Sequence, residues 1–492
     1  MHQAFLVTEV LLDVFRHLDK NPDPARKSSL SALARTCKTF HEPAMDLLWA
    51  TLDGVTPMLG CVPRLHQLIY CHGRVSRHIR DWSHSVGPLS EAEARQFLRH
   101  AARVRSMITS CEHVHLYSVL PLETCVFPGL LSLVVTAYHH SQNKYLYLFL
   151  SPTLRRCFLI HVPDLKSIAT HCPALEDLRI TDAADSTAEE LALLFDSIRL
   201  CKRLVTLSCP PFDWATWKDL SNLPSLLKVY VRGPPHRTPT LPFDRTMVNL
   251  APFINVTNLF FDVGTTAYVI SVMQHSEFPS LKQFRMAVDV LPWAEAEQLF
   301  RALSQCKATQ TLEHVSILSF GPGLQESSNN SLTVIPYFLS FTQLRFLHLQ
   351  LHFCIHLDND RLLEAISSWR NIHILLLMGP AMPPAITFRG LFAALRLCPH
   401  LHKLGILMDA VNIDIDPKDE SFQHTTLQTL DVTHSEIADA EAVARIIFST
   451  LPCVHRIMQQ HNGDAGMRFR KLWDEVNGHL KVLMAPISKS SV

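Results

Sequence analysis

Residues 172–180 read CPALEDLRI, and residues 398–406 read CPHLHKLGI. In both stretches apolar side chains stand at positions n, n+3 and n+5, where n is Leu175 or Leu401, and a proline stands at n−2. The apolar residues at n+3 and n+5 are typical of a strand with one buried face, because successive strand side chains point to opposite faces. Proline cannot continue a preceding helix and favours an extended start. Each stretch therefore predicts a helix end followed by a short strand.

The same three-position pattern recurs through most of the chain. Its first clear copy begins at Leu130 and its twelfth at Leu427, so the eleven steps have a mean spacing of 27 residues. Pattern and spacing resemble leucine-rich repeats, whose period is about 20–29 residues. The resemblance implies an α/β fold, an irregular horseshoe with parallel strands on the concave face and helices outside. The triplets are Leu130/Leu133/Val135, Leu154/Cys157/Leu159, Leu175/Leu178/Ile180, Leu204/Leu207/Cys209, Leu226/Val229/Val231, Val256/Leu259/Phe261, Leu281/Phe284/Met286, Leu312/Val315/Ile317, Leu344/Leu347/Leu349, Ile372/Leu375/Leu377, Leu401/Leu404/Ile406 and Leu427/Leu430/Val432.

The repeats depart from the usual pattern in one respect. Position n+8, which usually holds Asn or Cys, holds neither in any of the twelve copies, so we expect no asparagine ladder. Thr187 and Glu190 form a capping-box pattern before one of the helical runs that separate the strands. The alternative is a mixed α/β domain whose strands merely end in leucines. Weaker copies lie at Cys111/Val114/Leu116 and Val454/Ile457, and helical runs are predicted over residues 187–200, 294–306, 361–369, 388–397 and 440–448.

The first fifty residues predict three short helices. Apolar side chains over residues 7–18 recur at the 3.6-residue period of a helix, and two prolines in segment 19–27 interrupt it. A second apolar stripe covers residues 30–37, and a third helix is predicted to start at Pro43 and reach Trp49. Such a module is too small to bury all its apolar surface, so it usually docks on another surface.

These helices carry a second resemblance. LVTEVLLDVFRHLD at residues 6–19, L-x-x-L-A-x-x-C-K-x-F at 30–40 and LLW at 47–49 resemble an F-box, although the family usually has Pro where this chain has Val7. F-box modules dock on the Skp-type adaptor of cullin-RING ubiquitin ligases. Some of the matching residues must hold the three helices together, and an unrelated helical cap is the alternative. The residues that the resemblance assigns to adaptor binding are Leu6, Leu11, Val14, Phe15, Leu18, Leu33, Cys37, Phe40, Leu48 and Trp49.

The regions beside the repeats are predicted to be mainly helical. Ser90 and Glu93 form a capping-box pattern at the start of a predicted helix over residues 89–104, after a loop over 71–87. Apolar residues over 472–483 are spaced for a helix that caps the last repeat, and the tail from Ala485 is expected to be disordered. The chain is therefore divided into an F-box at 1–52, a helical linker at 53–104, a repeat solenoid at 105–460 and a capping helix with tail at 461–492.

Composition excludes several classes of protein. The 492 residues include 45 basic and 45 acidic ones, and this balance argues against a sequence-independent nucleic-acid binder, which needs a basic face. No apolar run approaches the ~18 residues of a membrane helix, and Glu9 and Asp13 interrupt the N-terminal one, so neither membrane insertion nor a signal peptide is expected. Thirteen cysteines without a dense framework indicate a reducing compartment, the cytoplasm and/or the nucleus.

No motif predicts a cofactor, a metal site or catalytic residues. Gly-rich phosphate cradles and G-x-S-x-G are missing from the sequence. His113 with His115, and His400 with His402, alternate on predicted strands, but a metal site needs a third ligand. The acidic run at 414–420 lacks the central Gly of a calcium loop. We therefore expect these histidines to be solvated. A histidine-based metalloenzyme remains a further hypothesis for the function of the chain, behind the two given below.

The order of the two modules resembles one class of ligase component. An F-box followed by leucine-rich repeats implies the non-catalytic substrate-recognition subunit of a Skp–cullin–F-box E3 ubiquitin ligase, with the repeats binding an unidentified target protein. Such a subunit raises the effective concentration of the target near the ubiquitin-loaded enzyme. Overall the chain resembles F-box proteins of filamentous and mushroom-forming fungi. The alternative is a leucine-rich-repeat interaction scaffold that is not engaged in ubiquitination.

The target-binding surface is predicted from strand periodicity. If n+3 and n+5 face the core, then n+2, n+4 and n+6 face the opposite side of the sheet. These positions are polar in early repeats and apolar in later ones, and exposed apolar clusters tend to mark binding sites. The alternative is that the loop over residues 380–386 or the C-terminal helix covers the cluster, or that the strands are buried on both faces. The predicted target-binding residues are Leu318, Phe346, Ile374, Leu376, Met378 and Leu407.

Overall fold

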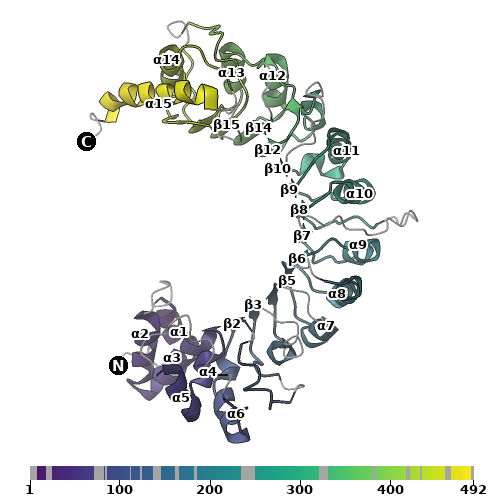
Figure 1. Ribbon diagram of the computed structural model, residues 1–492, viewed down its shortest axis with the longest axis vertical. Helices are drawn as coiled ribbons and strands as arrows, with labels where there is room; N and C mark the ends of the chain where they lie inside the picture. The colour runs from purple at the N-terminus through teal and green to yellow at the C-terminus, as the bar shows by residue number, and fades with distance from the viewer. Residues whose placement is uncertain are drawn as a thin grey trace. The chain divides into compact units, whose positions relative to one another are not determined.

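The computed structural model divides into two compact units, Met1–Leu226 and Leu227–Val492. Each unit consists of a ladder of parallel strands with helices in the connections between them (Figure 1). The structure describes residues 8–17, 25–70, 83, 86–110, 112–121, 125–136, 146–160, 166–181, 186–233, 250–320, 331–379, 384–416, 421–432, 435–459 and 467–488.

In the first unit the strands pair in parallel and in chain order, so each repeat adds one strand beside the previous one. The strands are β1 (Thr51–Asp53), β2 (Ser106–Thr109), β3 (Ser132–Val135), β4 (Arg156–Leu159), β5 (Asp177–Ile180) and β6 (Thr206–Cys209). The helices are α1 (Thr8–His17), α2 (Ala25–Ala34), α3 (Lys38–Ala50), α4 (Thr56–Leu59), α5 (Pro63–Tyr70), α6 (Glu91–Leu98), the 3₁₀ turn η2 (Ala101–Arg103), α7 (Lys166–His171), α8 (Ala188–Leu200) and α9 (Trp214–Ser221).

The second unit repeats the arrangement and adds a two-stranded parallel sheet of β11 (Ser331–Leu332) and β13 (Cys354–Ile355). Its main ladder contains β7 (Lys228–Arg232), β8 (Asn258–Val263), β9 (Gln283–Val288), β10 (His314–Ser319), β12 (Phe346–Gln350), β14 (Ile374–Met378), β15 (Lys403–Gly405), β16 (Thr429–Asp431) and β17 (Ile457–Met458). Its helices are α10 (Ala267–His275), α11 (Trp293–Ser304), η4 (Lys307–Gln310), η5 (Ile335–Tyr337), α12 (Asn359–Ser368), α13 (Phe388–Leu395), α14 (Ala440–Thr450) and α15 (Met467–Ser488).

The predicted triplets form the core of both units. Every n, n+3 and n+5 side chain of the twelve copies is buried, and each copy coincides with a strand of a ladder. One weak copy was misplaced. The strand that precedes β3 is β2, whose buried Val104, Met107 and Thr109 occupy n, n+3 and n+5, whereas Val114 and Leu116 are buried in a turn. The apolar pattern missed this copy because its core-facing n+5 position holds the polar residue Thr109.

Hydroxyl groups at position n−1 connect successive repeats where an asparagine ladder is missing. Thr153 Oγ1 lies 3.1 Å from Pro128 O and 3.0 Å from Leu130 O of the preceding repeat. Thr311 Oγ1 has the same relation to the Pro279 and Leu281 carbonyl oxygens. Each hydroxyl shares its proton between carbonyls at n−2 and n, which satisfies backbone acceptors at the turn that precedes the strand. Thr426 bonds the preceding repeat in the same way, and Ser225 Oγ donates to one carbonyl of that repeat, Leu204 O, at 2.8 Å.

The helices of the first unit show two corrections and two confirmations. Pro43 lies inside α3 rather than at its start. The predicted helix over 89–104 is interrupted after Leu98 and resumes as the 3₁₀ turn η2. Both capping boxes are formed as predicted, at Ser90–Glu93 before α6 and at Thr187–Glu190 before α8.

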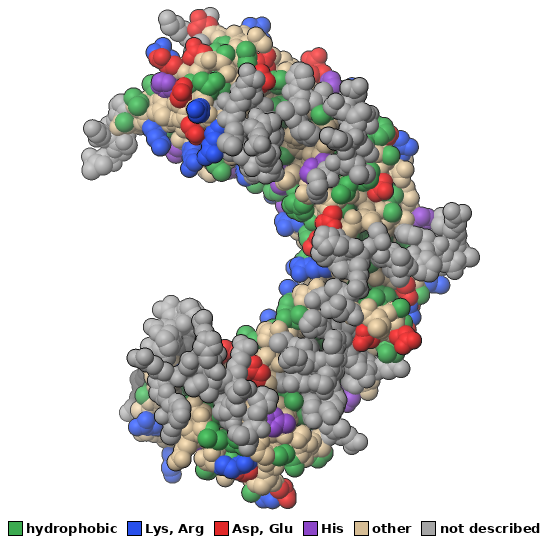
Figure 2. Space-filling model, in the orientation of Figure 1, with side chains coloured by type: hydrophobic (Ala, Val, Ile, Leu, Met, Phe, Trp, Pro, Cys, Tyr) green, Lys and Arg blue, Asp and Glu red, His purple; other side chains and the backbone are tan. Residues whose placement is uncertain are grey.

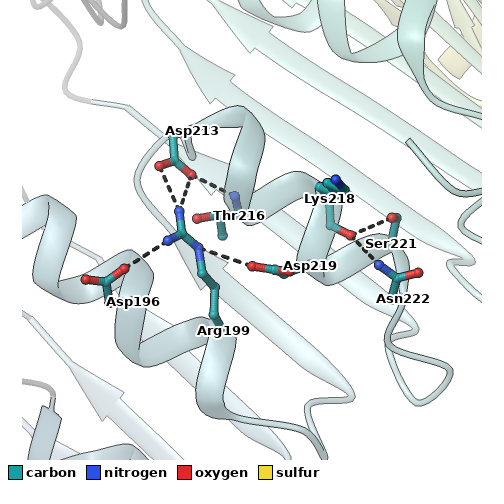
Figure 3. A network of polar contacts seen from close by, with 8 residues as sticks. All are labelled: Asp196, Arg199, Asp213, Thr216, Lys218, Asp219, Ser221 and Asn222. Carbon is teal, nitrogen blue, oxygen red and sulfur yellow. Dashed lines mark hydrogen bonds and ion pairs between the residues drawn. The ribbon is translucent and has the colours of Figure 1, made fainter. Parts of the chain in front are cut away.

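Arg199 joins α8 to α9 through three carboxylates (Figure 3). Its Nη1 lies 2.9 Å from Asp196, its Nη2 lies 2.9 Å from Asp213, and its Nε lies 3.3 Å from Asp219. Asp213 also accepts the backbone N–H of Thr216 at 2.7 Å and so caps α9. This cluster fixes two successive helices of the repeat array, which is a structural role.

The C-terminal helix α15 covers the last repeat, as predicted. Trp473 and Val476 are buried, and Trp473 Nε1 donates to Ser435 O at 2.9 Å. Asn477 pairs with the last strand: Ile457 N donates to Asn477 Oδ1 at 2.8 Å, and Asn477 Nδ2 donates to Ile457 O at 3.2 Å. The helix continues to Ser488, beyond the predicted start of the tail, whose residues 489–492 lie outside the described residues.

Candidate interaction surfaces

The N-terminal three-helix module has its own small core. Leu11 and Phe15 of α1 are 1% and 3% exposed and pack with Leu30 and Ala44. Phe15 meets Phe40 edge to face, with ring centroids 5.6 Å apart. Both Leu11 and Phe15 were assigned to adaptor binding by resemblance, but the structure places them between the helices, where they have almost no surface to offer a partner.

The outward face of α1 presents two valines one helical turn apart. Val10 is 39% exposed and Val14 is 45% exposed. Val14 belongs to the predicted adaptor-binding set, whereas Val10 was missed because it lies on the same apolar stripe as the core residues. Of the other predicted positions, Leu33, Phe40 and Leu48 are half-buried against the core, Cys37 is half-buried, and Leu6 and Leu18 lie outside the described residues.

Trp49, the last of the predicted adaptor residues, is half-buried against the linker. Its ring stacks on His100 with centroids 4.5 Å apart. Trp49 Nε1 and His100 Nδ1 are both buried, and neither has a hydrogen-bond partner in the described part of the chain. Burial, reinforced by Arg99 and Arg103, lowers the pKa of His100. Trp49 therefore attaches the three-helix module to the rest of the first unit.

Arg103 strengthens the same attachment. It pairs with Glu42 and Asp46, both on α3, and the hydrogen bond and charge of Arg103 lower the pKa of Glu42. Strand β1 follows α3 directly, and Thr51 is in register with Ser106 of β2. The module is thus continuous with the first repeats. The predicted boundary at residue 52 falls inside β1, and the four-part division of the chain stays a prediction.

A second surface is the strand face of the second unit, defined here as the n+2, n+4 and n+6 side chains of β7–β15. The six predicted target-binding residues lie on it. Leu318, Phe346, Ile374, Met378 and Leu407 are half-exposed, whereas Leu376 is 6% exposed. Leu376 and Met378 lie above Gly405, where a Cβ atom would come within 2.7 Å of Leu376 Cδ2 and 2.8 Å of Met378 Cε. Leu407 also lines a cavity of about 80 Å³.

Two histidines on the strand face are uncharged at neutral pH. His314 stacks on Phe346 with centroids 3.8 Å apart and planes 5° apart. Burial, with Arg285 and His348 nearby, lowers the pKa of His314 to about 4. Burial, with a smaller contribution from Lys403, lowers the pKa of His348 to about 4. The middle of the strand face is therefore neutral and aromatic.

Four cations lie on the same face. They are Lys228 and Arg232, which occupy n+2 and n+6 of their strand, and Arg285 and Lys403, which occupy n+4 and n+2 of theirs. Period-two counting could find all four in the sequence, but it could not show whether a carboxylate neutralises them.

The two histidine pairs lie in different surroundings. His113 lies in a turn at φ 60° rather than on a strand, and it contacts Ser83 Oγ at 2.7 Å while His115 contacts Ser83 O at 2.8 Å. His400 and His402 lie near His373, with ring centroids 6.0 and 5.6 Å from it. Within the described ranges, no group of three or more metal-ligating side chains could hold an ion.

The repeated Cys-Pro sequences have a packing role. Cys172 and Cys398 are both buried, and burial raises the pKa of each thiol to about 12. A thiol with such a pKa stays protonated at neutral pH and is a poor nucleophile.

Among the helices that the structure describes, none is both long and apolar enough to cross a bilayer.

Comparison with known proteins agrees with the F-box resemblance. Residues 8–54 match the family model described as F-box-like, and this match covers α1–α3 and β1, so the chain carries an F-box-like domain there. No curated protein sequence matches the chain. Among solved structures, the chain is similar to an internalin from Listeria monocytogenes, with 12% identity over 69% of this chain and 82% of the internalin and a TM-score of 0.34. It is also similar to a chain of the yeast Rad7 and Elc1 complex, with 12% identity over 90% of this chain and 96% of that chain and a TM-score of 0.37.

Proposed function

We propose that this chain is the substrate-recognition subunit of a Skp–cullin–F-box E3 ubiquitin ligase. The F-box-like domain binds a Skp-type adaptor and, through it, the cullin-RING ligase, while the repeats bind a target protein. F-box and leucine-rich-repeat domains are typically non-catalytic, so the ubiquitin transfer belongs to other subunits. The observation that carries the proposal is the F-box-like match at residues 8–54.

The surface of α1 supports the adaptor-binding role. Val10 and Val14 are exposed on one face of the helix, while Leu11 and Phe15 on the adjacent face complete the three-helix core. Two valines at i and i+4 form a small apolar stripe that a partner helix or groove can cover. Because each side chain is already more than half buried, covering the rest would contribute less than the roughly 1.5–3 kcal/mol gained when a fully exposed valine is buried.

The attachment of the F-box-like domain to the first repeats supports the receptor role. Trp49 stacks on His100, and Arg103 pairs with Glu42 and Asp46. A ligase needs this kind of fixed connection because the target must be held at a defined position relative to the ubiquitin-loaded enzyme. Effective concentration falls when a flexible linker replaces a rigid one of matched length.

The test is co-purification of the full chain with a co-expressed Skp-type adaptor. We expect the wild type to retain the adaptor and a Val10→Asp/Val14→Asp variant to lose it, because two carboxylates would be desolvated at the contact. Val482→Asp is the matched control, since Val482 is a 72% exposed valine on α15. Full adaptor retention by the double variant, with its circular dichroism unchanged, would contradict adaptor binding through α1.

Cullin co-purification and ubiquitin conjugation distinguish the ligase subunit from the alternative, an interaction scaffold. A ligase receptor brings the cullin with the adaptor and supports ubiquitin conjugation to captured proteins, whereas a scaffold retains the adaptor alone or neither. The proposed function also implies residence in the cytoplasm and/or the nucleus, where thiols stay reduced. The described cysteines are unpaired, in agreement with such a compartment.

A further inference from the structure

We infer that the strand face of the second unit binds an extended protein segment with an acidic end and an apolar end. The inference rests on the proposed function, because it identifies the chemistry of the target that the repeats hold. It depends on charges and aromatic side chains within the second unit alone.

The cationic end of the strand face lies on β7–β9. Lys228, Arg232 and Arg285 occupy its n+2, n+6 and n+4 positions, and all three are exposed. Within the described part of the chain, none of them has a carboxylate oxygen within 4.0 Å. Figure 2 shows Lys and Arg side chains on the strand side of the molecule beside these strands.

The basic residues at position n+1, next to the strand face, are paired with a carboxylate, unlike the cations on the strand face itself. At n+1, Glu313 lies between two basic residues, with Lys282 Nζ at 3.7 Å and Arg345 Nε at 4.0 Å. At n+1 a carboxylate on the neighbouring strand thus pairs with the cations, whereas none of Lys228, Arg232 and Arg285 has such a partner within 4.0 Å in the described part of the chain. Uncompensated cations on one surface attract an anionic partner and speed its association.

The cationic side chains are held by neutral groups. Arg285 Nε and Nη2 lie 2.6 and 2.8 Å from the Gln283 amide oxygen when that amide is oriented to satisfy its neighbours. The Arg232 guanidinium lies 6.0 Å from the centre of the Phe260 ring. These contacts orient the guanidinium groups without cancelling their charge, so less side-chain entropy is lost when an anion binds.

Asp262 is an opposing charge on this part of the face. It is in register with Arg232, and its pKa is raised by burial and by Asp289, while Arg232 acts in the opposite direction. Two carboxylates, Asp262 and Asp289, against three cations leave this end of the strand face net positive by one charge. The bound segment therefore needs more than one negative charge to compete with Asp262.

The apolar end lies on β12 and β14. Phe346 and Ile374 are in register, and Met378 lies further along β14. All three are half-exposed, and the neighbouring His314 and His348 are neutral, so this end attracts apolar side chains rather than charge. Three cations thus lie on β7–β9 and an apolar cluster lies on β12 and β14, with the single cation Lys403 in register with Ile374 beyond it. This order matches a segment with several acidic residues at one end and apolar residues at the other.

Sheet geometry sets the length of the segment. From β8 to β14 the ladder has four steps, each about 4.8 Å, which gives roughly 19 Å. An extended chain covers about 3.3 Å per residue, so about six residues separate the acidic and apolar groups of the ligand. The ligand crosses the strands, because one strand alone does not carry both kinds of side chain.

The experiment measures fluorescence polarisation of labelled peptides with the full chain, co-purified with its adaptor. The main probe has three Glu residues, a Gly/Ser spacer of about six residues and a Leu-Phe-Leu end, matching the span derived above. Companion probes replace Glu by Lys, replace Glu by phosphoserine, or omit the spacer. We expect the Glu probe to bind at least about tenfold more tightly than the Lys probe, and to weaken as salt rises from about 50 to about 200 mM.

Variants assign the two ends. Arg232→Glu/Arg285→Glu should weaken the Glu probe by about tenfold or more and improve the Lys probe, and Arg232→Gln/Arg285→Gln should give a smaller loss if the reversed charges disturb folding. Arg370→Glu/Lys481→Glu is the control, because both residues are exposed in the second unit and lie outside the strand face. Phe346→Ala should weaken the Glu probe while leaving its salt dependence unchanged.

Each outcome bears on a separate claim. Equal binding of the Glu and Lys probes, or no binding of either, would overturn the inference, and retention of the adaptor in the same preparation would leave the proposed function standing. Loss of the adaptor with intact Glu selectivity would contradict the proposed function and leave the inference about the strand face standing. Preference for phosphoserine over Glu would support the anionic end and identify phosphate as the source of its charge, whereas preference for Glu would support it and identify carboxylates.

Discussion

Trp49 of α3 stacks on His100, with ring centroids 4.5 Å apart and ring planes 11° apart. The contact joins the F-box-like domain to the turn before β2, and it buries a ring nitrogen of each partner. A residue that resemblance assigns to the adaptor thus stabilises the first unit. Its loss would affect adaptor binding through the placement of α3 as well as through any direct contact.

The first prediction concerns the pH dependence of this contact. The pKa of His100 is lowered mainly by burial, so below about 6.5 the unfolded state binds its proton more readily than the folded state. The contribution of His100 to stability is therefore fully present above pH 6.5 and declines as the pH falls toward its lower folded pKa. In His100→Phe, which keeps an aromatic ring, the urea midpoint of unfolding should fall less between pH 7.5 and 5.5 than in the wild type. Equal falls in both proteins would show that His100 does not titrate on unfolding.

The second prediction concerns the hydroxyl groups that join repeats. Thr311→Val keeps the shape of the side chain and removes the donor that serves the Pro279 and Leu281 carbonyls. Loss of this bond should lower the free energy of unfolding by about 1–2 kcal/mol, measured by urea titration. Thr342→Val is the control, because Thr342 is exposed and should change stability by less than about 0.5 kcal/mol. Similar effects of both substitutions would contradict a special role for position n−1.

The third prediction compares two glycines in the second unit. A Cβ on Gly390 of α13 would lie 1.9 Å from Asn359 Oδ1, whereas a Cβ on Gly478 of α15 would meet nothing within 4 Å. Gly390→Ala should therefore destabilise by about 1–3 kcal/mol, because it also displaces the Asn359 bonds to Thr387. Gly478→Ala should stabilise by about 0.5–1 kcal/mol, since Ala loses less conformational freedom than Gly in a helix. Thermal unfolding of the two variants checks both signs, and the same sign for both would contradict this account.

The strand ladder was predictable because its signal is local. Period-two alternation and a preceding proline identify a strand such as β5 without knowledge of its neighbours, and the capping box at Thr187 and Glu190 does the same for α8. The copy that begins at Val104 was not predicted because Thr109 occupies its core position n+5. Pro43 was predicted at the start of a helix rather than inside it, because a first-turn proline is common and a proline within a helix is uncommon.

The interaction surfaces were less predictable because they depend on pairs of distant residues. An apolar stripe on α1 includes both Leu11 and Val14, and only the packing of α2 and α3 determines which of them is buried. The charge of Arg285 is visible in the sequence, but whether a carboxylate lies beside it depends on strand register. His113 appeared to alternate with His115, but a left-handed backbone places it in a turn.

The pairing of Asn477 with Ile457 affects how the repeat array ends. A parallel ladder has no intrinsic last strand, because each new strand leaves another row of unpaired amides for the next chain to join. At Ile457 one side-chain amide occupies both the donor and the acceptor, so a strand from another molecule cannot pair there without displacing α15. Duplication or loss of repeats upstream would leave this terminus unchanged. The number of repeats can therefore vary during evolution without creating a site for end-to-end polymerisation at this position.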